Sequence, residues 1–340
     1  MTNRNKKIKV QTYFFILIFS FSLASCHNKQ REIKFIINDS AARYVLADLR
    51  RAKIEKEIIW ERYKGFQIVR EWHKQNGTPE ADLLKEGIEQ SKVDTAFATG
   101  LIKIIDDVQM LYKAHNREIS NHILSFLPSK DGYDVNIYII ALSVCTGCSM
   151  NDDIMVDIVA SYKSNAAHLL NSMIHEAFHN GYGYCNPNFV LLDSIPKNKK
   201  TFLRKILIYL QNEGMATYAG YTTRKIIPLQ FKKDEPNLLS QDYSLLEDNS
   251  SVRKAISQVN YLIEKTNYMS LDSLDKVAWN LGVMQRSYYV TGAYISKTIE
   301  AKYGREHLAG LIKKDETVFI KEYNDIVQKE YQIELLKETK

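Results

Sequence analysis

Apolar residues recur at helical spacing over most of the chain. The first such segment runs from Ser40, which can cap a helix, to about residue 73. A Gly-Thr-Pro sequence then interrupts the pattern, and helical spacing resumes over residues 80–92 and 94–115. We therefore expect residues 32–130 to form a helical N-terminal region.

A second pattern begins after a turn-forming cluster at residues 128–132. Residues 135–142 are rich in β-branched and aromatic side chains, and residues 153–160 alternate, so both should be strands joined by a hairpin loop. Helical spacing then returns. The sequence thus predicts a mostly α-helical protein with a small antiparallel β-sheet, an α+β fold. Residues 131–340 would form a second region, although residues 32–340 could equally be one domain.

The first 25 residues have the pattern of an export signal. Basic residues precede an apolar run from Tyr13 to Ala24, which is too short to span a bilayer comfortably. The run ends in Leu23-Ala24-Ser25-Cys26, which resembles the bacterial lipoprotein box. The resemblance implies cleavage before Cys26 and a lipid on its thiol. An uncleaved N-terminal anchor helix is the alternative.

A lipid on Cys26 would determine where the protein acts. Residues 26–31 would form a polar tether, and the remaining chain would lie outside the cytoplasm, anchored to a membrane of the cell envelope. The net charge is +6, and removal of the four cations of residues 1–25 leaves +2. A chain this close to neutral has no electrostatic basis for binding nucleic acid.

Three further cysteines, Cys145, Cys148 and Cys185, would then lie in a compartment that permits disulfides. Cys145 and Cys148 could close a small loop, or one of them could pair with Cys185. All three could also stay reduced without a role. A redox-active pair is a further alternative, although no thioredoxin-like βαβ pattern surrounds it.

The sequence His175-Glu176-Ala177-Phe178-His179 points most directly to chemistry. It lies in a helix expected from Ala166 to Asn180 and ended by Gly181. Histidines four residues apart project from one helix face and can bind one zinc ion. Glu176 could then accept a proton from a zinc-activated water. The alternative is a helix with two solvated histidines and a surface glutamate.

A catalytic zinc ion needs a third protein ligand and one open position. A histidine six residues after His179 would complete a metzincin arrangement, but that residue is Cys185. His168 lies two helical turns before the motif and is expected to pack nearby rather than bind metal. Glu213 is the remaining candidate, because a buried carboxylate in the apolar helical pattern of residues 207–218 needs a partner.

The motif followed on a later helix by Glu213-Gly214-Met215-Ala216 resembles the gluzincin type of zinc peptidase, and particularly the poorly characterised bacterial families of zinc-dependent peptidases. The resemblance implies a zincin-like fold and one Zn²⁺ held by His175, His179 and Glu213, with Glu176 as the base. The small residues Gly214 and Ala216 should let this helix approach the motif helix closely. The long connection before Glu213 is compatible with an inserted loop.

The sequence Tyr288-Tyr289-Val290-Thr291-Gly292 is similar to the Tyr-x-x-Gly helix of some gluzincins. There the tyrosine hydroxyl donates a hydrogen bond to the oxyanion that forms during hydrolysis. This implies the same role for Tyr289, with Tyr288 as the second choice, and such a donor can lower a barrier by a few kcal/mol. The alternative is that both are core tyrosines in a chain that has 21 of them.

Together these features predict a lipid-anchored zinc metallopeptidase that acts on peptides or proteins of the cell envelope. Two other functions fit the same sequence. A non-catalytic binding or assembly lipoprotein would carry a coincidental or degenerate motif, although every expected ligand and the base are present. A zinc hydrolase of a non-peptide amide or ester would use the same site. No feature of the sequence specifies an oligomeric state.

Overall fold

The computed structural model describes most of the chain from residue 32 onward. The described ranges are 32–49, 62–75, 95–142, 147–150, 153–161, 165–192, 194–227 and 238–335. The expected signal segment, the tether, Cys26 and Cys145 lie outside these ranges. Among the described residues, no helix combines the length and the apolar character needed to cross a bilayer.

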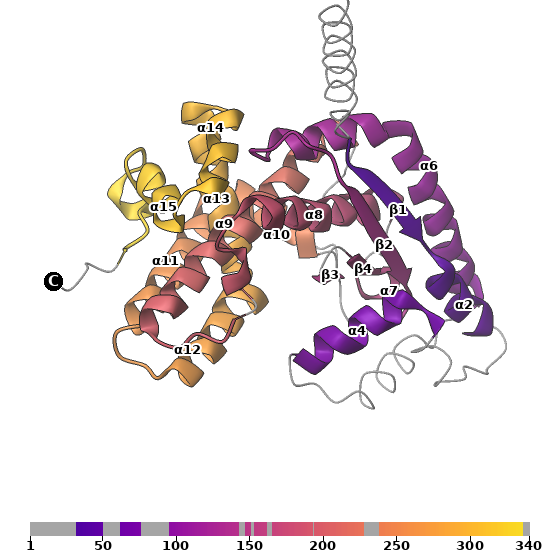
Figure 1. The fold of residues 1–340 in the computed structure, drawn as a ribbon, viewed down its shortest axis with the longest axis horizontal. Helices are drawn as coiled ribbons and strands as arrows, with labels where there is room; N and C mark the ends of the chain where they lie inside the picture. The colour runs from indigo at the N-terminus through magenta and orange to yellow at the C-terminus, as the bar shows by residue number, and fades with distance from the viewer. Residues whose placement is uncertain are drawn as a thin grey trace, which may run out of the picture.

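One half of the molecule is built on a four-stranded sheet (Figure 1). The strands are β1 (Lys34–Asn38), β2 (Asp134–Ile140), β3 (Gly147–Met150) and β4 (Asp153–Asp157), in the spatial order β1-β2-β4-β3. β2 pairs in parallel with both β1 and β4, and only β3 and β4 are antiparallel. The expectation of an antiparallel sheet is therefore wrong, because the sheet is mixed, whereas the mostly helical α+β class is confirmed.

The hairpin lies one strand later than expected. It joins β3 to β4, while the two strands that the sequence predicted, β2 and β4, run side by side in the same direction. β4 is also shorter than predicted, because the buried carboxylate of Asp157 accepts hydrogen bonds from the backbone N–H groups of Val159 and Leu142, and a short helix begins at Ile158. β1 falls in the segment predicted to be helical.

Helices make up most of the remaining described chain. They are α2 (Ser40–Leu49), α4 (Lys64–Gln75), α6 (Thr95–Ser125), α7 (Ile158–Ser161), α8 (Ala166–Cys185), α9 (Lys199–Thr223), α10 (Leu238–Glu247), α11 (Asn249–Lys265), α12 (Leu271–Ala278), α13 (Ser287–Tyr303), α14 (Arg305–Gly310) and α15 (Glu316–Asn324). Short 3-10 segments are η1 (Phe189–Leu191), η3 (Leu311–Lys313) and η4 (Lys329–Tyr331), and η2 (Trp279–Met284) is a π-helical turn.

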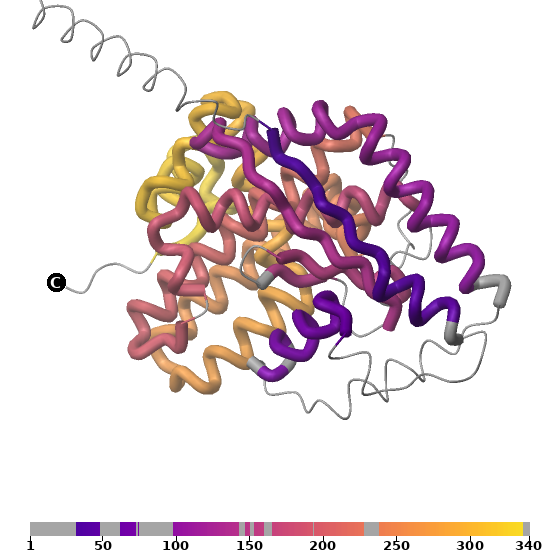
Figure 2. Tube along the Cα trace, turned by 45° about the vertical axis from the view of Figure 1, so that its right-hand side comes forward, coloured from indigo at the N-terminus to yellow at the C-terminus, as the bar shows by residue number. Residues whose placement is uncertain are grey.

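Helix α8 connects the two halves of the molecule. It packs on β3, β4 and α6 on one side and on α9 on the other, and α9 in turn packs along α13. Figure 1 shows α8 between the sheet and the group of helices from α9 to α15. Figure 2 shows α4 in front of the sheet, where Gly65 of α4 lies against Tyr138 and Ile140 of β2. Residues on α8 therefore face both halves.

Two glycines differ from their expected roles. Gly181 does not end α8, which continues to Cys185. A Cβ atom at Gly181 would lie 2.3 Å from Leu127 Cδ1 and 2.4 Å from Tyr133 Oη, so this glycine allows close packing inside the helix. Gly214 was expected to bring α9 close to α8, but a Cβ atom there would lie 2.2 Å from the Cα atom of Gly292. The close approach is therefore between α9 and α13.

Candidate metal centre

Helix α8 presents its two motif histidines inside the protein. The helix begins after Asn165, whose side-chain oxygen accepts a hydrogen bond from the N–H of His168 and caps the first turn. His175 and His179 follow one turn apart, with only 4% and 6% of their surfaces exposed. The alternative of two solvated histidines is therefore wrong.

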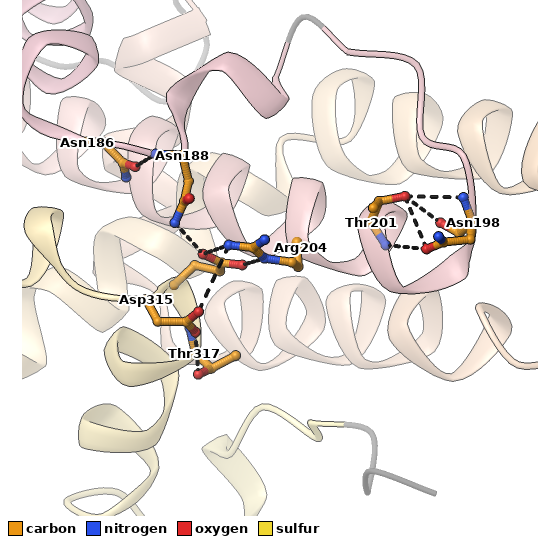
Figure 3. A network of polar contacts seen from close by, with 8 residues as sticks. Asn186, Asn188, Asn198, Thr201, Arg204, Asp315 and Thr317 are labelled. Atoms are coloured by element: carbon orange, nitrogen blue, oxygen red, sulfur yellow. Dashed lines mark hydrogen bonds and ion pairs between the residues drawn. The ribbon is translucent and has the colours of Figure 1, made fainter.

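Helix α9 brings Glu213 to the same point. The helix begins with a capping box in which Asn198 and Thr201 exchange side-chain to backbone hydrogen bonds (Figure 3). Glu213 Oε2 lies 3.3 Å from His179 Nε2 and 3.5 Å from His175 Nε2, and the two Nε2 atoms are 3.1 Å apart. These three side chains form a group of potential metal ligands. The structure thus brings the three sequence-predicted ligands together.

The three donor atoms fit a zinc ion. Zinc bonds to histidine nitrogen and carboxylate oxygen are about 2.0–2.2 Å long, so neighbouring ligands at tetrahedral angles lie about 3.3 Å apart. The observed separations of 3.1, 3.3 and 3.5 Å bracket that value. Glu213 Oε2 is buried and accepts no hydrogen bond in the structure. A buried carboxylate oxygen without a donor is costly, and a cation would satisfy it.

His179 is oriented by the residue before Glu213. Its Nδ1 lies 2.9 Å from Asn212 Oδ1, which can only accept, so Nδ1 carries a proton, and in the neutral ring Nε2 keeps its lone pair toward Glu213. Such partners commonly fix the tautomer of a metal-binding histidine. His175 Nδ1 is buried and has no hydrogen-bond partner in the described part of the chain. Asn212 is a supporting residue that sequence reasoning missed.

Without a metal ion, the protonation of the group reflects burial and mutual attraction. Burial lowers the pKa of His175 to about 4. Burial also opposes the charged form of His179, but the attraction of the Glu213 carboxylate outweighs it and raises the pKa of His179 to about 9. The two histidines hold the pKa of Glu213 below its usual range despite burial. The carboxylate therefore stays ionised, as a zinc ligand must.

Glu176 projects beside the ligand group toward the edge of the sheet. A Cβ atom at Gly147 of β3 would lie 3.2 Å from Glu176 Oε1. The glycine therefore leaves room for the carboxylate. Burial raises the pKa of Glu176 to about 7. A carboxylate with a pKa near neutrality is suited to accept and return a proton.

The two candidate tyrosines of α13 have different surroundings. The Tyr289 ring lies nearly parallel to the His175 ring, with centroids 6.3 Å apart and an angle of 18° between the planes. Tyr288 is buried, stacks on Tyr209 and covers Gly282. Tyr289 lines the same cavity as the histidines, and Tyr288 does not. The structure therefore places Tyr289, the first choice of the sequence, beside the candidate metal ligands.

These side chains surround a cavity of about 260 Å³. His175, Glu176, His179 and Glu213 supply its charged floor, together with Arg286. Its apolar lining consists of aromatic and aliphatic side chains, namely Trp72, Phe189, Leu192, Tyr209, Leu238, Leu239, Trp279 and Val283. A cavity in which several polar and charged side chains converge next to aromatic and aliphatic ones is typical of a binding or active site.

One wall of the cavity is held by a polar network (Figure 3). Glu316 of α15, almost fully buried, pairs with Arg204 of α9 and accepts a hydrogen bond of 3.2 Å from Asn188 Nδ2. The backbone N–H of Asn188 donates to Asn186 Oδ1 at 2.7 Å. These contacts fix the chain directly before Phe189, which lines the cavity.

Arg286 also belongs to the site, and no sequence pattern pointed to it. Its guanidinium lies over the face of Tyr289 and pairs with the buried carboxylate of Asp242. Only the structure identifies Arg286, because its partner Asp242 lies on a separate helix, 44 residues away in the sequence.

His168, Cys148 and Cys185 take no part in the ligand group. His168 is buried at the start of α8, as expected for a packed residue. Cys148 lines the cavity from β3 and is a free thiol, and Cys185 at the end of α8 is also free. No disulfide therefore joins Cys148 to Cys185.

Comparison with known proteins gives one match. The model of a family described as "Putative zinc dependent peptidase (DUF5700)" matches residues 102–332. This range contains all three candidate ligands, Glu176 and Tyr289. No curated protein and no solved structure matches the chain.

Proposed function

Because the chain belongs to the DUF5700 family of zinc-dependent peptidases, we propose that it hydrolyses peptide bonds at one zinc ion held by His175, His179 and Glu213. The observation that carries this proposal is the convergence of three donor atoms from α8 and α9 at separations suited to zinc, with Glu176 beside them. The ligand set, two motif histidines and a glutamate on a later helix, is of the gluzincin type.

The residues around the metal have distinct proposed roles. A bound zinc ion would lower the pKa of a water molecule and polarise the scissile carbonyl. Glu176 would accept a proton from the attacking water and return it to the leaving nitrogen. The Tyr289 hydroxyl would donate a hydrogen bond to the carbonyl oxygen as it becomes an oxyanion.

An open strand edge favours a peptide as the substrate. Among the described strands, β3 pairs only with β4, and Gly147, Cys148 and Ser149 of β3 line the cavity. An extended peptide could add to this edge through main-chain hydrogen bonds and would then pass next to Glu176. This observation favours a peptidase over a hydrolase of small esters or amides. The complete set of ligands and base argues against a non-catalytic lipoprotein.

Zinc content and hydrolysis should be measured on the same protein samples. We expect about one equivalent of zinc in the wild type and in Glu176→Gln, and loss of zinc in His179→Ala. Hydrolysis of a peptide library should fall by at least about 10²-fold in Glu176→Gln. The matched control is Glu118→Gln, which changes an exposed glutamate of α6. This variant should have the zinc content and hydrolysis of the wild type. Zinc below about a tenth of an equivalent, or full hydrolysis by Glu176→Gln, would contradict the proposal.

We further propose that the protein is anchored to a membrane of the cell envelope by a lipid on Cys26. The lipoprotein-like sequence that ends at Cys26 supports this location. Cys26→Ser expressed in a bacterial host should move the protein from the membrane fraction to a soluble or uncleaved form. An unchanged distribution and unchanged mass would argue for an uncleaved anchor instead.

A further inference from the structure

Arg286 stands at an irregular point of the backbone beside the cavity. Its φ angle is +62°, and among the described residues it is the only non-glycine residue with a positive φ. The π-helical turn η2 ends two residues earlier, at Met284. Both features are uncommon, and both are found preferentially at functional sites. The irregular backbone carries the Arg286 side chain into the cavity wall.

The guanidinium of Arg286 is clamped by Asp242 of α10. Arg286 Nε donates to both carboxylate oxygens at 2.9 and 3.2 Å, and Nη2 donates to Oδ2 at 2.5 Å. Asp242 is fully buried, and the Arg286 side chain is 12% exposed. A planar guanidinium held in this two-pronged way has a fixed plane as well as a fixed position.

That plane lies on the Tyr289 ring. Arg286 Cζ is 3.2 Å from the ring centroid, within the range of a cation–π contact. The same ring lies parallel to within 18° to the ring of His175. The clamped guanidinium thus blocks one direction in which the tyrosine side chain could rotate away from the ligand group.

We propose that Arg286, clamped by Asp242, is a positioning residue that holds the Tyr289 hydroxyl in place for the oxyanion formed during hydrolysis. The inference rests on the proposed peptidase function. A hydrogen-bond donor stabilises a transition state most when its orientation is set in advance, because no reorganisation is then needed as charge develops. Arg286 would act through Tyr289 rather than on the substrate.

A purely structural ion pair between α10 and α13 would have different consequences. Such a pair would contribute to stability. Its removal would change kcat by the same factor with or without the Tyr289 hydroxyl. The chain offers a more exposed counterpart as a control, in which an arginine also lies over a tyrosine ring and pairs with a carboxylate. Arg224 Cζ lies 3.8 Å from the Tyr221 ring centroid and its Nη1 donates to Glu247 at 2.8 Å, and none of the three lines the cavity.

A double-mutant cycle tests the inference. Arg286→Lys keeps a positive charge opposite Asp242 but removes the planar group over the ring. We expect Tyr289→Phe to lower kcat about 10²-fold. Arg286→Lys should lower kcat at least about 10-fold with KM changed less than about twofold. In the Tyr289→Phe background, Arg286→Lys should lower kcat by less than a further factor of about two. Arg224→Lys should leave kcat and KM unchanged.

Several results would overturn the inference. They are multiplicative losses in the double variant, a loss confined to KM, and an Arg286→Lys variant as active as the wild type. Asp242→Asn, which weakens the clamp with little change in shape, gives the same test if Arg286→Lys does not fold. Its loss of kcat should likewise vanish in the Tyr289→Phe background. A wild-type protein without zinc or hydrolysis would instead refute the proposed function itself.

Discussion

Gly214 of α9 and Gly292 of α13 meet backbone to backbone where the two helices cross. A Cβ atom at Gly292 would lie 2.6 Å from the Gly214 Cα atom and 2.0 Å from the carbonyl oxygen of Leu210. Glu213 immediately precedes the first glycine, and Tyr289 precedes the second by three residues. The crossing therefore sets the distance between a candidate metal ligand and the tyrosine proposed to face the reacting carbonyl.

Gly214→Ala should separate α9 from α13 and disturb the metal site. The added methyl group overlaps backbone, which cannot move as a flexible side chain can, so we expect a loss of about 1–3 kcal/mol in the free energy of unfolding. Zinc affinity should fall as well. Gly100→Ala is the control, because nothing lies within 4 Å of that position on α6. It should be neutral or stabilise by up to about 1 kcal/mol. Equal behaviour of the two variants would contradict the close crossing.

Asn212→Ala should weaken zinc binding without unfolding the protein. The substitution removes the acceptor that holds the His179 ring by Nδ1, and loss of such a partner typically costs about 10–100-fold in metal affinity. Competition with a chromophoric chelator measures this directly. Asn212→Asp keeps an acceptor and should retain most of the affinity. An Asn212→Ala variant with wild-type affinity would show that His179 needs no support from α9.

Arg204→Met should be strongly destabilising, because it leaves the Glu316 carboxylate buried without its cation. Removal of one member of a fully buried ion pair costs about 3–5 kcal/mol, and the loss here should be smaller because the Arg204 side chain is 33% exposed. Arg253→Met removes an exposed pair with Glu330 and should change the free energy of unfolding by less than about 1 kcal/mol. Urea unfolding of both variants gives the comparison. Similar losses of stability in the two variants would mean that the Arg204–Glu316 pair contributes no more than an exposed one.

Stability should decrease below neutral pH in part through His122. Burial lowers its pKa to about 4, and Nε2 lies 2.9 Å from the carbonyl oxygen of Ala219. An unfolded histidine has a pKa of about 6.5, so between pH 6.5 and 4 the unfolded chain binds a proton that the folded chain does not. The free energy of unfolding therefore falls as the pH is lowered, by about 2 kcal/mol from this group at pH 4.5.

His122→Gln, which keeps a donor for Ala219, should show a correspondingly smaller loss between pH 7 and pH 4.5. Both proteins should be unfolded with urea in the presence of a chelator, so that the metal site contributes equally. Parallel pH dependence in the two proteins would exclude His122 as the source.

The three candidate ligands could be predicted because they depend on local spacing. Residues His175 and His179 share a helix face wherever that helix lies, and Glu213 stood out as a carboxylate in an apolar pattern. Tyr289 was predictable only through resemblance to a family motif. The residues that support these groups were not predictable. The contacts of Arg286 with Asp242 and of His179 with Asn212 form only when separate helices pack together. No pattern in a single sequence indicates such contacts.

The sheet shows the same limit. The apolar runs of β2 and β4 identified two strands, but their relative direction depends on β3, which lies between them in the chain and folds back on β4. β1 follows no strong alternation and precedes a helical pattern, so nothing local distinguished it. Parallel pairing with a strand far along the chain is determined by tertiary packing and not by local sequence.

The pairing of Lys34 with Asp134 has a consequence for how the protein assembles. During synthesis, β1 cannot pair until about a hundred later residues have been made. Contacts between residues so far apart in the sequence slow folding. The family match begins at residue 102, yet β1 belongs to the same sheet as β3 and β4 beside the cavity. A fragment cut at residue 102 would present the bare edge of β2 to other chains and would tend to aggregate. The N-terminal segment thus belongs to the same folding unit as the residues that the family model matches.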